Sequence, residues 1–211
     1  MSLSGGLFKR LSVSQHLCLV FSLFLYTTLP MISADVQAAW QSDFNVQVLS
    51  PKVQTIFFEE KLSVDGMQTR IETAGSDETD LYHFKDLTEI RIFPGDGIYF
   101  KKPLSLAKQV KSAKEGWGPI PETFHETKIF LQKGVFKDRA AALYLFILKR
   151  GEQSAYTLRW ISDDLAAHPL RAIYTSSGRE TIIVDFDQKT ETALPSDFFN
   201  PPAGFLSLNP F

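Results

Sequence analysis

Cysteine is almost missing from this sequence of 211 residues, because Cys18 is the only one. We expect Cys18 to lie in a leader that is removed, which leaves the mature chain without a thiol for a disulfide or a metal ion. Histidine is also scarce, with four copies that are far apart in the sequence. His125-Glu126 begins like a zinc-protease helix, but Ile129 stands where the second histidine would be. The sequence therefore predicts no metal site and no cofactor.

An excess of positive charge is absent as well. The chain has 22 Lys and Arg against 24 Asp and Glu, for a net charge of −2. No region reaches the basic density that is typical of nucleic-acid-binding proteins. We therefore expect no nucleic-acid partner.

Catalytic motifs are incomplete wherever they begin. Residues 105–108 (SLAK) match a four-residue serine-hydrolase pattern, but the companion motifs of that pattern are missing. Residues 95–97 (GDG) lack the third glycine of a phosphate-binding loop. Asp163-Asp164 is a pair of carboxylates, but turns favour aspartate for structural reasons. We expect that the protein is not an enzyme, and we keep a hydrolase only as a third hypothesis without a nominated residue.

The first feature that is present is a targeting segment. Lys9 and Arg10 precede an almost wholly apolar run from Leu17 to Leu29, and small residues follow up to Ala38. This pattern predicts a signal peptide over residues 1–38 that is cleaved on secretion to the periplasm. The alternative is an uncleaved leader that anchors the protein in the inner membrane, because the longer stretch Leu17–Ala34 is just long enough to be a candidate span.

The rest of the chain, residues 39–211, is short enough to form one domain. Apolar residues make up 44% of the sequence, and there are 18 Phe against 6 Tyr and 3 Trp. This composition provides ample material for a broad apolar interior.

A β-hairpin over Thr88–Leu104 organises the predicted fold. Ile90 and Ile92 alternate with polar residues, as in a strand with one buried face. Residues 94–97 (PGDG) have the composition of a turn, and the second arm returns from Ile98. A hairpin with one apolar face needs another surface to cover it, so we expect neighbouring strands to curve round that face.

Similar alternation before and after this hairpin predicts about 10–11 antiparallel strands. One further segment, Leu104–Glu115, has Leu106, Val110 and Ala113 at helical spacing and is followed by Gly116. The expected architecture is α+β, with a curved antiparallel sheet around an apolar interior. Whether that interior is hollow or filled is left open by the sequence.

Several local motifs resemble a group of uncharacterised secreted bacterial proteins. These are similar to the LolA/LolB-like superfamily of periplasmic lipoprotein carriers. The motifs are Gly66 followed by Arg70-Ile71-Glu72, the hairpin ending IYFKKPL (98–104), Trp160-Ile161-Ser162 followed by Pro169-Leu170-Arg171, and the closing segment FFNPPAGF (198–205). The resemblance implies an unclosed β-barrel over residues 39–211, with one or more helices covering its mouth and an apolar cavity for acyl chains.

The sequence departs from the carriers in two respects. Only one helix is predicted, where the carriers place several. The carriers also use an interior arginine to hold the helical lid, and Arg70 is the nearest match by position. Alternation places Arg70 on the polar face with Gln68 and Glu72, so we do not expect Arg70 to hold the helix.

These observations predict a periplasmic binding or carrier protein for a lipid or the acyl chains of a lipoprotein, in transient contact with membrane surfaces. The alternative is an envelope sensor or protein-interaction module that uses the same fold with a filled core. The predicted inner-face, ligand-binding residues are Phe57, Ile71, Phe84, Ile90, Ile92, Ile98, Phe100, Tyr156, Leu158 and Trp160. The predicted lid or partner surface consists of Leu106, Val110, Lys111 and Trp117.

Overall fold

The computed structural model describes residues 39–50, 54–164 and 168–208. The predicted leader, residues 1–38, lies outside the described residues, as do Val53 at the predicted start of a strand and residues 165–167 of a predicted connection. All described residues belong to one compact unit, Gln37–Phe211.

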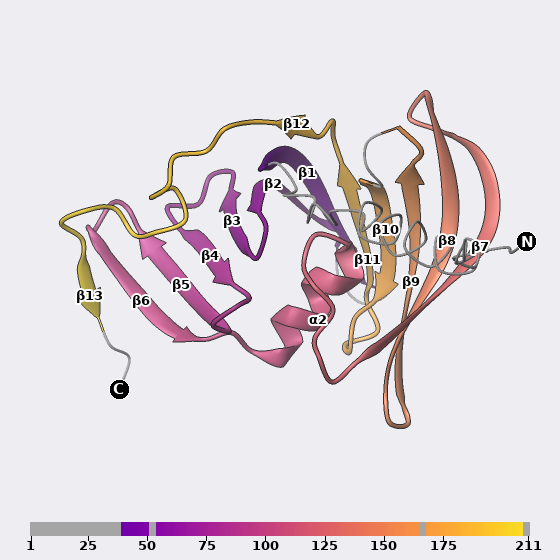
Figure 1. The fold of residues 1–211 in the computed structure, drawn as a ribbon, viewed down its shortest axis with the longest axis horizontal. Helices are drawn as coiled ribbons and strands as arrows, with labels where there is room; N and C mark the ends of the chain where they lie inside the picture. The colour runs from indigo at the N-terminus through magenta and orange to yellow at the C-terminus, as the bar shows by residue number, and fades with distance from the viewer. Residues whose placement is uncertain (1–38, 51–53, 165–167, 209–211) are drawn as a thin grey trace, which may run out of the picture. The chain divides into compact units, whose positions relative to one another are not determined.

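One large curved sheet dominates the described residues (Figure 1). It contains thirteen strands in the order β13-β6-β5-β4-β3-β2-β1-β11-β10-β9-β8-β7, with β12 paired to β1 off this path. The strands are β1 (Trp40–Leu49), β2 (Ile56–Asp65), β3 (Gln68–Thr73), β4 (Thr79–His83), β5 (Thr88–Phe93), β6 (Ile98–Pro103), β7 (His125–Phe136), β8 (Arg139–Arg150), β9 (Gln153–Ser162), β10 (Pro169–Thr175), β11 (Thr181–Phe186), β12 (Thr190–Glu191) and β13 (Leu206–Leu208).

The sheet is antiparallel throughout except where β13 pairs with β6 in parallel. Its two halves meet at the pairing of β1 with β11, where Phe44 lies opposite Phe186. The edges are β13 and β7, which do not pair with each other, so the sheet stays unclosed. The prediction of a curved, unclosed antiparallel sheet is confirmed.

The predicted strand number was too low by the two short strands near the C-terminus. β12 has two residues and β13 has three. Neither is long enough to show alternation of apolar and polar residues, which is the signal on which a strand prediction depends. The hairpin predicted over Thr88–Leu104 is present as β5 and β6.

Helix α2 spans Leu106–Glu115 and follows the hairpin directly (Figure 1). The Ser105 side chain caps its start by accepting a hydrogen bond from the amide of Lys108. Gly116 ends it with φ 89°, and its amide donates to the carbonyl of Ser112. The helix therefore begins two residues later than its apolar spacing predicts, because Ser105 acts as the cap.

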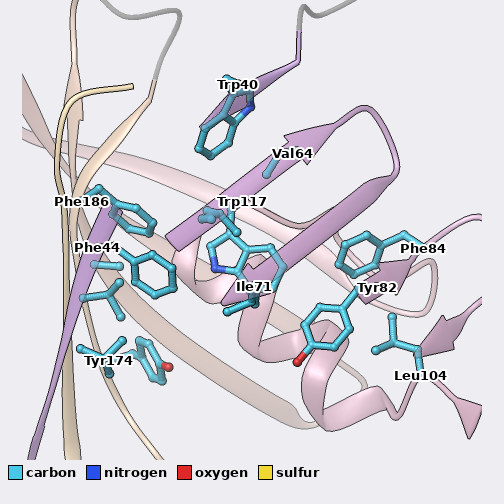
Figure 2. Packing of buried hydrophobic residues seen from close by; sticks show 14 residues of the cluster. Trp40, Phe44, Val64, Ile71, Tyr82, Phe84, Leu104, Trp117, Tyr174 and Phe186 are labelled. Atoms are coloured by element: carbon cyan, nitrogen blue, oxygen red, sulfur yellow. The ribbon is translucent and has the colours of Figure 1, made fainter. Parts of the chain in front are cut away.

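The main core lies on the face of the sheet against which α2 packs, called the inner face below. Phe44 of β1 and Phe186 of β11 stack there with ring centroids 5.5 Å apart. Trp117, which follows α2, is buried in the same cluster and stacks on Tyr82 with centroids 5.9 Å apart (Figure 2). The interior is therefore filled in this region.

A smaller cluster occupies the opposite, outer face of β4 and β5. It is formed by Leu81, Ile90 and Ile92, and Tyr99 and Phe205 pack against it. The C-terminal segment, which contains Phe205, thus buries apolar side chains that point away from the main core. Within the residues that the structure describes, no helix has the length and apolar character needed to cross a membrane.

Candidate ligand groove beside helix α2

The face on which a side chain lies follows from the strand register, because residues directly opposite each other in a sheet share a face. Arg159 of β9 lies opposite Ala172, and Ala172 lies opposite Val184. Val184 in turn lies opposite Val46 of β1. Ala172, Val184 and Val46 belong to the main core, so these positions and every second residue from them face inward.

Four of the ten predicted inner-face residues lie on the inner face. Ile71 and Phe84 are buried in the main core. Phe100 lies opposite Arg91, which lies opposite Asp80 and hence follows the face of Ile71. Ile98 shares that face by alternation along β6 and is half-buried, as is Phe100. The structure leaves their role as ligand contacts untested.

The other six lie on the outer face, so their predicted orientation is wrong. Ile90 and Ile92 are buried in the outer cluster with Leu81. Phe57 of β2 is 69% exposed. Tyr156, Leu158 and Trp160 of β9 alternate with Thr157 and Arg159, which face inward. These three residues therefore face outward.

The reason for this error lies in β9 and its neighbours. The inward set on β9 includes Thr157 and Arg159, which are polar in the sequence yet buried in the structure. The outward set is more apolar but partly exposed, with Tyr156 at 56%. Alternation distinguishes the two faces of a strand, but it identifies the buried face only when polar residues lie in water.

An apolar groove of about 550 Å³ runs between α2 and the second half of the sheet. This size lies within the range of small-molecule sites, roughly 300–1,000 Å³. The groove is lined by Leu106, Ala107, Val110, Lys111 and Lys114 of α2, by Phe124 and Arg150, and by Gln153, Ser154, Ala155, Tyr174, Ser176, Ser177 and Ile182.

Three of the four residues predicted as a lid surface line this groove: Leu106, Val110 and Lys111. The fourth, Trp117, does not belong to an exposed surface. It is 6% exposed and packs between Tyr82 and Phe84. Trp117 lies in a Gly- and Pro-rich loop, residues 116–121, of a composition typical of exposed loops. In the structure this loop folds back onto the helix, because the amides of Trp117 and Gly118 donate to the carbonyl oxygen of Ser112.

A buried arginine holds the end of α2 to the sheet. The Arg159 guanidinium donates from Nε to the carbonyl oxygen of Lys114 at 2.9 Å and from a terminal nitrogen to that of Ala113. It also lies 3.8 Å from the ring centroid of Phe146. These carbonyls are in the last turn, where helices leave acceptors unsatisfied and where a positive charge is favourable.

Sequence reasoning missed Arg159, although it considered an interior arginine. Arg70, the match by position, faces outward and pairs with Glu72 at 2.6 Å, as the alternation predicted. Burial lowers the pKa of Arg159 to about 10, opposed by the nearby carboxylates of Glu126 and Glu115, so the group stays charged at neutral pH. The available signal was an arginine alternating with apolar residues within a strand.

A fully buried carboxylate sits beside this contact. Glu115 accepts hydrogen bonds from Trp117 Nε1 at 2.8 Å and from the Tyr174 hydroxyl at 2.5 Å. Its other neighbour is the Lys111 ammonium, 3.0 Å away in an i,i+4 ion pair. Burial and the charge of Glu115 raise the pKa of Tyr174, so the tyrosine remains a donor. Glu115 thus joins the helix, the following loop and β10.

The other end of α2 is tied to the first half of the sheet. The Lys108 ammonium lies 2.5 Å from a carboxylate oxygen of Glu89 on β5 and 3.8 Å from Asp80 on β4. The side chain of Glu89 is 1% exposed and is also approached by Lys102 at 3.3 Å. The helix is therefore anchored by charged groups on both sides.

A second cavity, of about 500 Å³, lies beside β1, β2 and β3. Its lining includes Asp43, Glu59, Glu60, Glu72 and Asp187. A wall with this many carboxylates suits an apolar ligand poorly. Among the described residues, no group of three or more His, Cys, Asp or Glu side chains could hold a metal ion.

No family model and no curated protein sequence matches this chain. Solved structures do. They include a LolA superfamily protein from Nitrosomonas europaea, at 12% identity and a TM-score of 0.45, covering 78% of this chain and 90% of that one. A DUF1329 family protein from Desulfovibrio piger has 10% identity and a TM-score of 0.45, covering 79% and 91%.

A third similar structure is lipoprotein LppX of Mycobacterium tuberculosis, at 11% identity and a TM-score of 0.37, covering 87% of this chain and 99% of that one. LolA superfamily structures are thus among those to which this chain is similar, as the resemblance in the sequence motifs implied.

Proposed function

We propose that this protein binds and carries a lipid, or the acyl chain of a lipoprotein, in the groove between α2 and strands β9–β11. The observation that carries the proposal is the groove itself, about 550 Å³ in volume. Its walls include Leu106 and Val110 of the helix and Ile182 and Ala155 of the sheet. Such a surface favours a flexible hydrocarbon over a polar substrate. The leader would deliver the protein to the periplasm, and no chemical step is part of this function.

Burial alone can provide the affinity. Each methylene group that leaves water contributes about 0.8 kcal/mol, so a single long acyl chain is sufficient for useful binding. Helix α2 forms one wall of the groove and would cover the mouth of the sheet. Two contacts would hold that wall in place around the ligand. They are the ion pair of Lys108 with Glu89 and the hydrogen bond from Arg159 to the main-chain carbonyl of Lys114.

The proposal is tested by native mass spectrometry of protein purified from the periplasm, together with uptake of a fluorescent fatty acid. Ile182 and Ile183 provide a matched pair, because they are adjacent on β11, both half-buried and on opposite faces. Ile182→Gln places a polar group in the groove and is expected to weaken uptake at least fivefold. Ile183→Gln changes the outer face and is expected to leave uptake unchanged.

Absence of co-purifying lipid together with absence of fatty-acid uptake would overturn the carrier function. Equal effects of the two glutamine substitutions would place binding somewhere other than the groove. Circular dichroism and the melting temperature of each variant show that both are folded before uptake is compared.

A second candidate function is an envelope sensor or interaction module, and the edge strand β7 favours it. The residues from His125 to Val135 are all exposed, although the side chain of Glu126 turns towards Arg159. One edge of β7 pairs with no other strand in the described part of the chain. A long open edge can accept an extended segment of a partner protein as a further strand. Trp117, the partner contact expected from the sequence, is buried and does not belong to this surface.

A photo-crosslinking residue at Thr127 of β7 tests this candidate, with the same residue at Thr190 of β12 as the control. The interaction module would be supported if the lipid-free protein crosslinks to one defined partner protein from Thr127 and not from Thr190. Equal capture from both positions, or none from either, would count against it.

A further inference from the structure

The charged side chains around the groove all carry the same sign. Lys111, Lys114 and Arg150 are among the lining residues, and no carboxylate is. Lys111 is neutralised by Glu115 at 3.0 Å. Within the described residues, Lys114 and Arg150 have no carboxylate within ion-pair distance. Two cations without a counter-charge therefore border an apolar cavity.

Lys114 is held in place but lacks an acidic partner. Its ammonium donates to the carbonyl oxygen of Thr175 at 3.1 Å and lies 4.2 Å from the ring centroid of Tyr174. Burial lowers the pKa of Lys114, and the charge of Glu115 opposes this effect only in part. The charged form of a buried ammonium is stabilised when an anion approaches it.

Arg150 is similarly held by neutral groups. Its guanidinium donates to Gln153 Oε1 at 3.0 Å and lies 5.2 Å from the ring centroid of Phe124. These contacts leave further N–H groups of the guanidinium for another acceptor, since arginine carries five donors. The planar fork of an arginine matches a carboxylate or a phosphate better than any neutral head group.

The register shows where the two cations lie along the groove. Arg150 and Gln153 lie opposite each other at the end of the β8–β9 hairpin. Further from the hairpin, Ala155 and then the pair Tyr174 and Ile182 follow on the inner face. Lys114 contacts Thr175 and Tyr174, so it lies on the other side of Ala155 from Arg150 along the groove. An anionic head group beside Ala155 would thus have a cation on each side.

We propose that the ligand is a single-chain amphiphile with an anionic head group, with the chain in the groove and the head held by Lys114 and Arg150. This inference rests on the proposed function and adds the class of ligand to it. Two sources share this chemistry: the carboxylate of a fatty acid, and the phosphate of a singly acylated phospholipid.

Binding of three ligands with the same C16 chain to the full-length protein tests the inference: hexadecanoic acid, hexadecyl phosphate and hexadecanol. Displacement of a fluorescent probe gives each dissociation constant at low and high salt. We expect at least one anion to bind tenfold or more tightly than the alcohol, and this preference to shrink in high salt. Preference for the carboxylate identifies a fatty acid, and preference for the phosphate identifies a phospholipid.

The double variant Lys114→Gln, Arg150→Gln is expected to bind all three ligands with the affinity of the alcohol. Lys149→Gln is the matched control, because Lys149 is adjacent to Arg150, exposed and directed to the outer face. It is expected to keep the preference for anions.

Equal affinity of the native protein for all three ligands would overturn the anionic head group and leave the carrier function standing. Failure of the native protein to bind any of the three would overturn both. Because these outcomes are read from the native protein, they do not depend on whether the variants fold.

Discussion

Arg159 Nε donates a hydrogen bond to the main-chain carbonyl oxygen of Lys114 at 2.9 Å, which joins strand β9 to the last turn of helix α2. Lys114 lines the groove, so this contact positions one of its cations. At the other end of the helix, Lys108 reaches Glu89 on β5. The helix that forms one wall of the groove is therefore held from both halves of the sheet by buried polar contacts.

Replacement of Arg159 by Met is expected to lower the free energy of unfolding by about 2–3 kcal/mol, because two helix carbonyls lose a charged donor in a buried place. Urea unfolding measures this loss, and hydrogen exchange should increase most at the amides of α2. Arg179→Met, in an exposed turn, is the control and should change the free energy of unfolding by less than about 0.5 kcal/mol. Equal destabilisation by both variants would contradict the role given to Arg159.

Loss of the Glu115 charge should also destabilise the protein. Glu115→Gln keeps the size of the side chain, but it removes the anion that accepts from Trp117 and Tyr174 and pairs with Lys111. We expect the free energy of unfolding to fall by about 2 kcal/mol, the middle of the range for a buried polar group that loses its partner. The loss stays below the top of that range because Lys111 is partly exposed, so water can solvate its charge. Chemical unfolding followed by tryptophan fluorescence measures it.

The double variant Glu115→Gln, Lys111→Met gives the control for this pair. It removes the unpaired ammonium and should be more stable than Glu115→Gln alone. A double variant less stable than either single variant would show that the loss in Glu115→Gln does not come from the broken ion pair.

Stability should fall as the pH is lowered, because of His168. It is buried between the rings of Trp40 and Phe186. Burial lowers the pKa of His168 from 6.5 to about 4, and the positive charges of Lys189 and Arg139 add to this, opposed by a hydrogen bond with the backbone of Asp187.

The unfolded state takes up the His168 proton below pH 6.5, whereas the folded state does so only near pH 4. Stability is therefore full above pH 6.5 and falls between these values, by up to about 3 kcal/mol for a change of this size. Urea unfolding at pH 7 and pH 5 measures the loss, which should be smaller in His168→Gln. The raised pKa of Glu60 acts in the opposite direction, but it is common to both proteins and cancels in the comparison. The same slope in both proteins would contradict this assignment.

The loop after α2 should tolerate no side chain at Gly118. A Cβ atom there would lie 2.2 Å from Ser112 Oγ, 2.5 Å from Ser112 Cβ and 3.0 Å from Phe84 Cζ. Because Ser112 is fully buried, Gly118→Ala is expected to cost about 1–3 kcal/mol in thermal or urea unfolding. Gly95→Ala, where a Cβ would meet nothing within 4 Å, should have little effect. A small effect at both positions would mean that the loop shifts readily.

Patterns among residues that are close in the sequence determined much of the fold. The alternation of Ile90 and Ile92, the turn before Ile98 and the helical spacing of Leu106 and Val110 predict a hairpin followed by a helix, and both are present. These features involve residues close in sequence, so composition and spacing are sufficient to reveal them. The polar orientation of Arg70 was predicted for the same reason.

Only the tertiary structure decided which face of β9 is buried and what fills the interior. Arg159 and Thr157 are buried because helix carbonyls and neighbouring strands surround them, while Tyr156 and Leu158 lie partly in water. Trp117 is buried because its loop folds under α2. Each of these outcomes depends on contacts between residues far apart in the chain, which hydrophobic periodicity within one strand or helix does not encode.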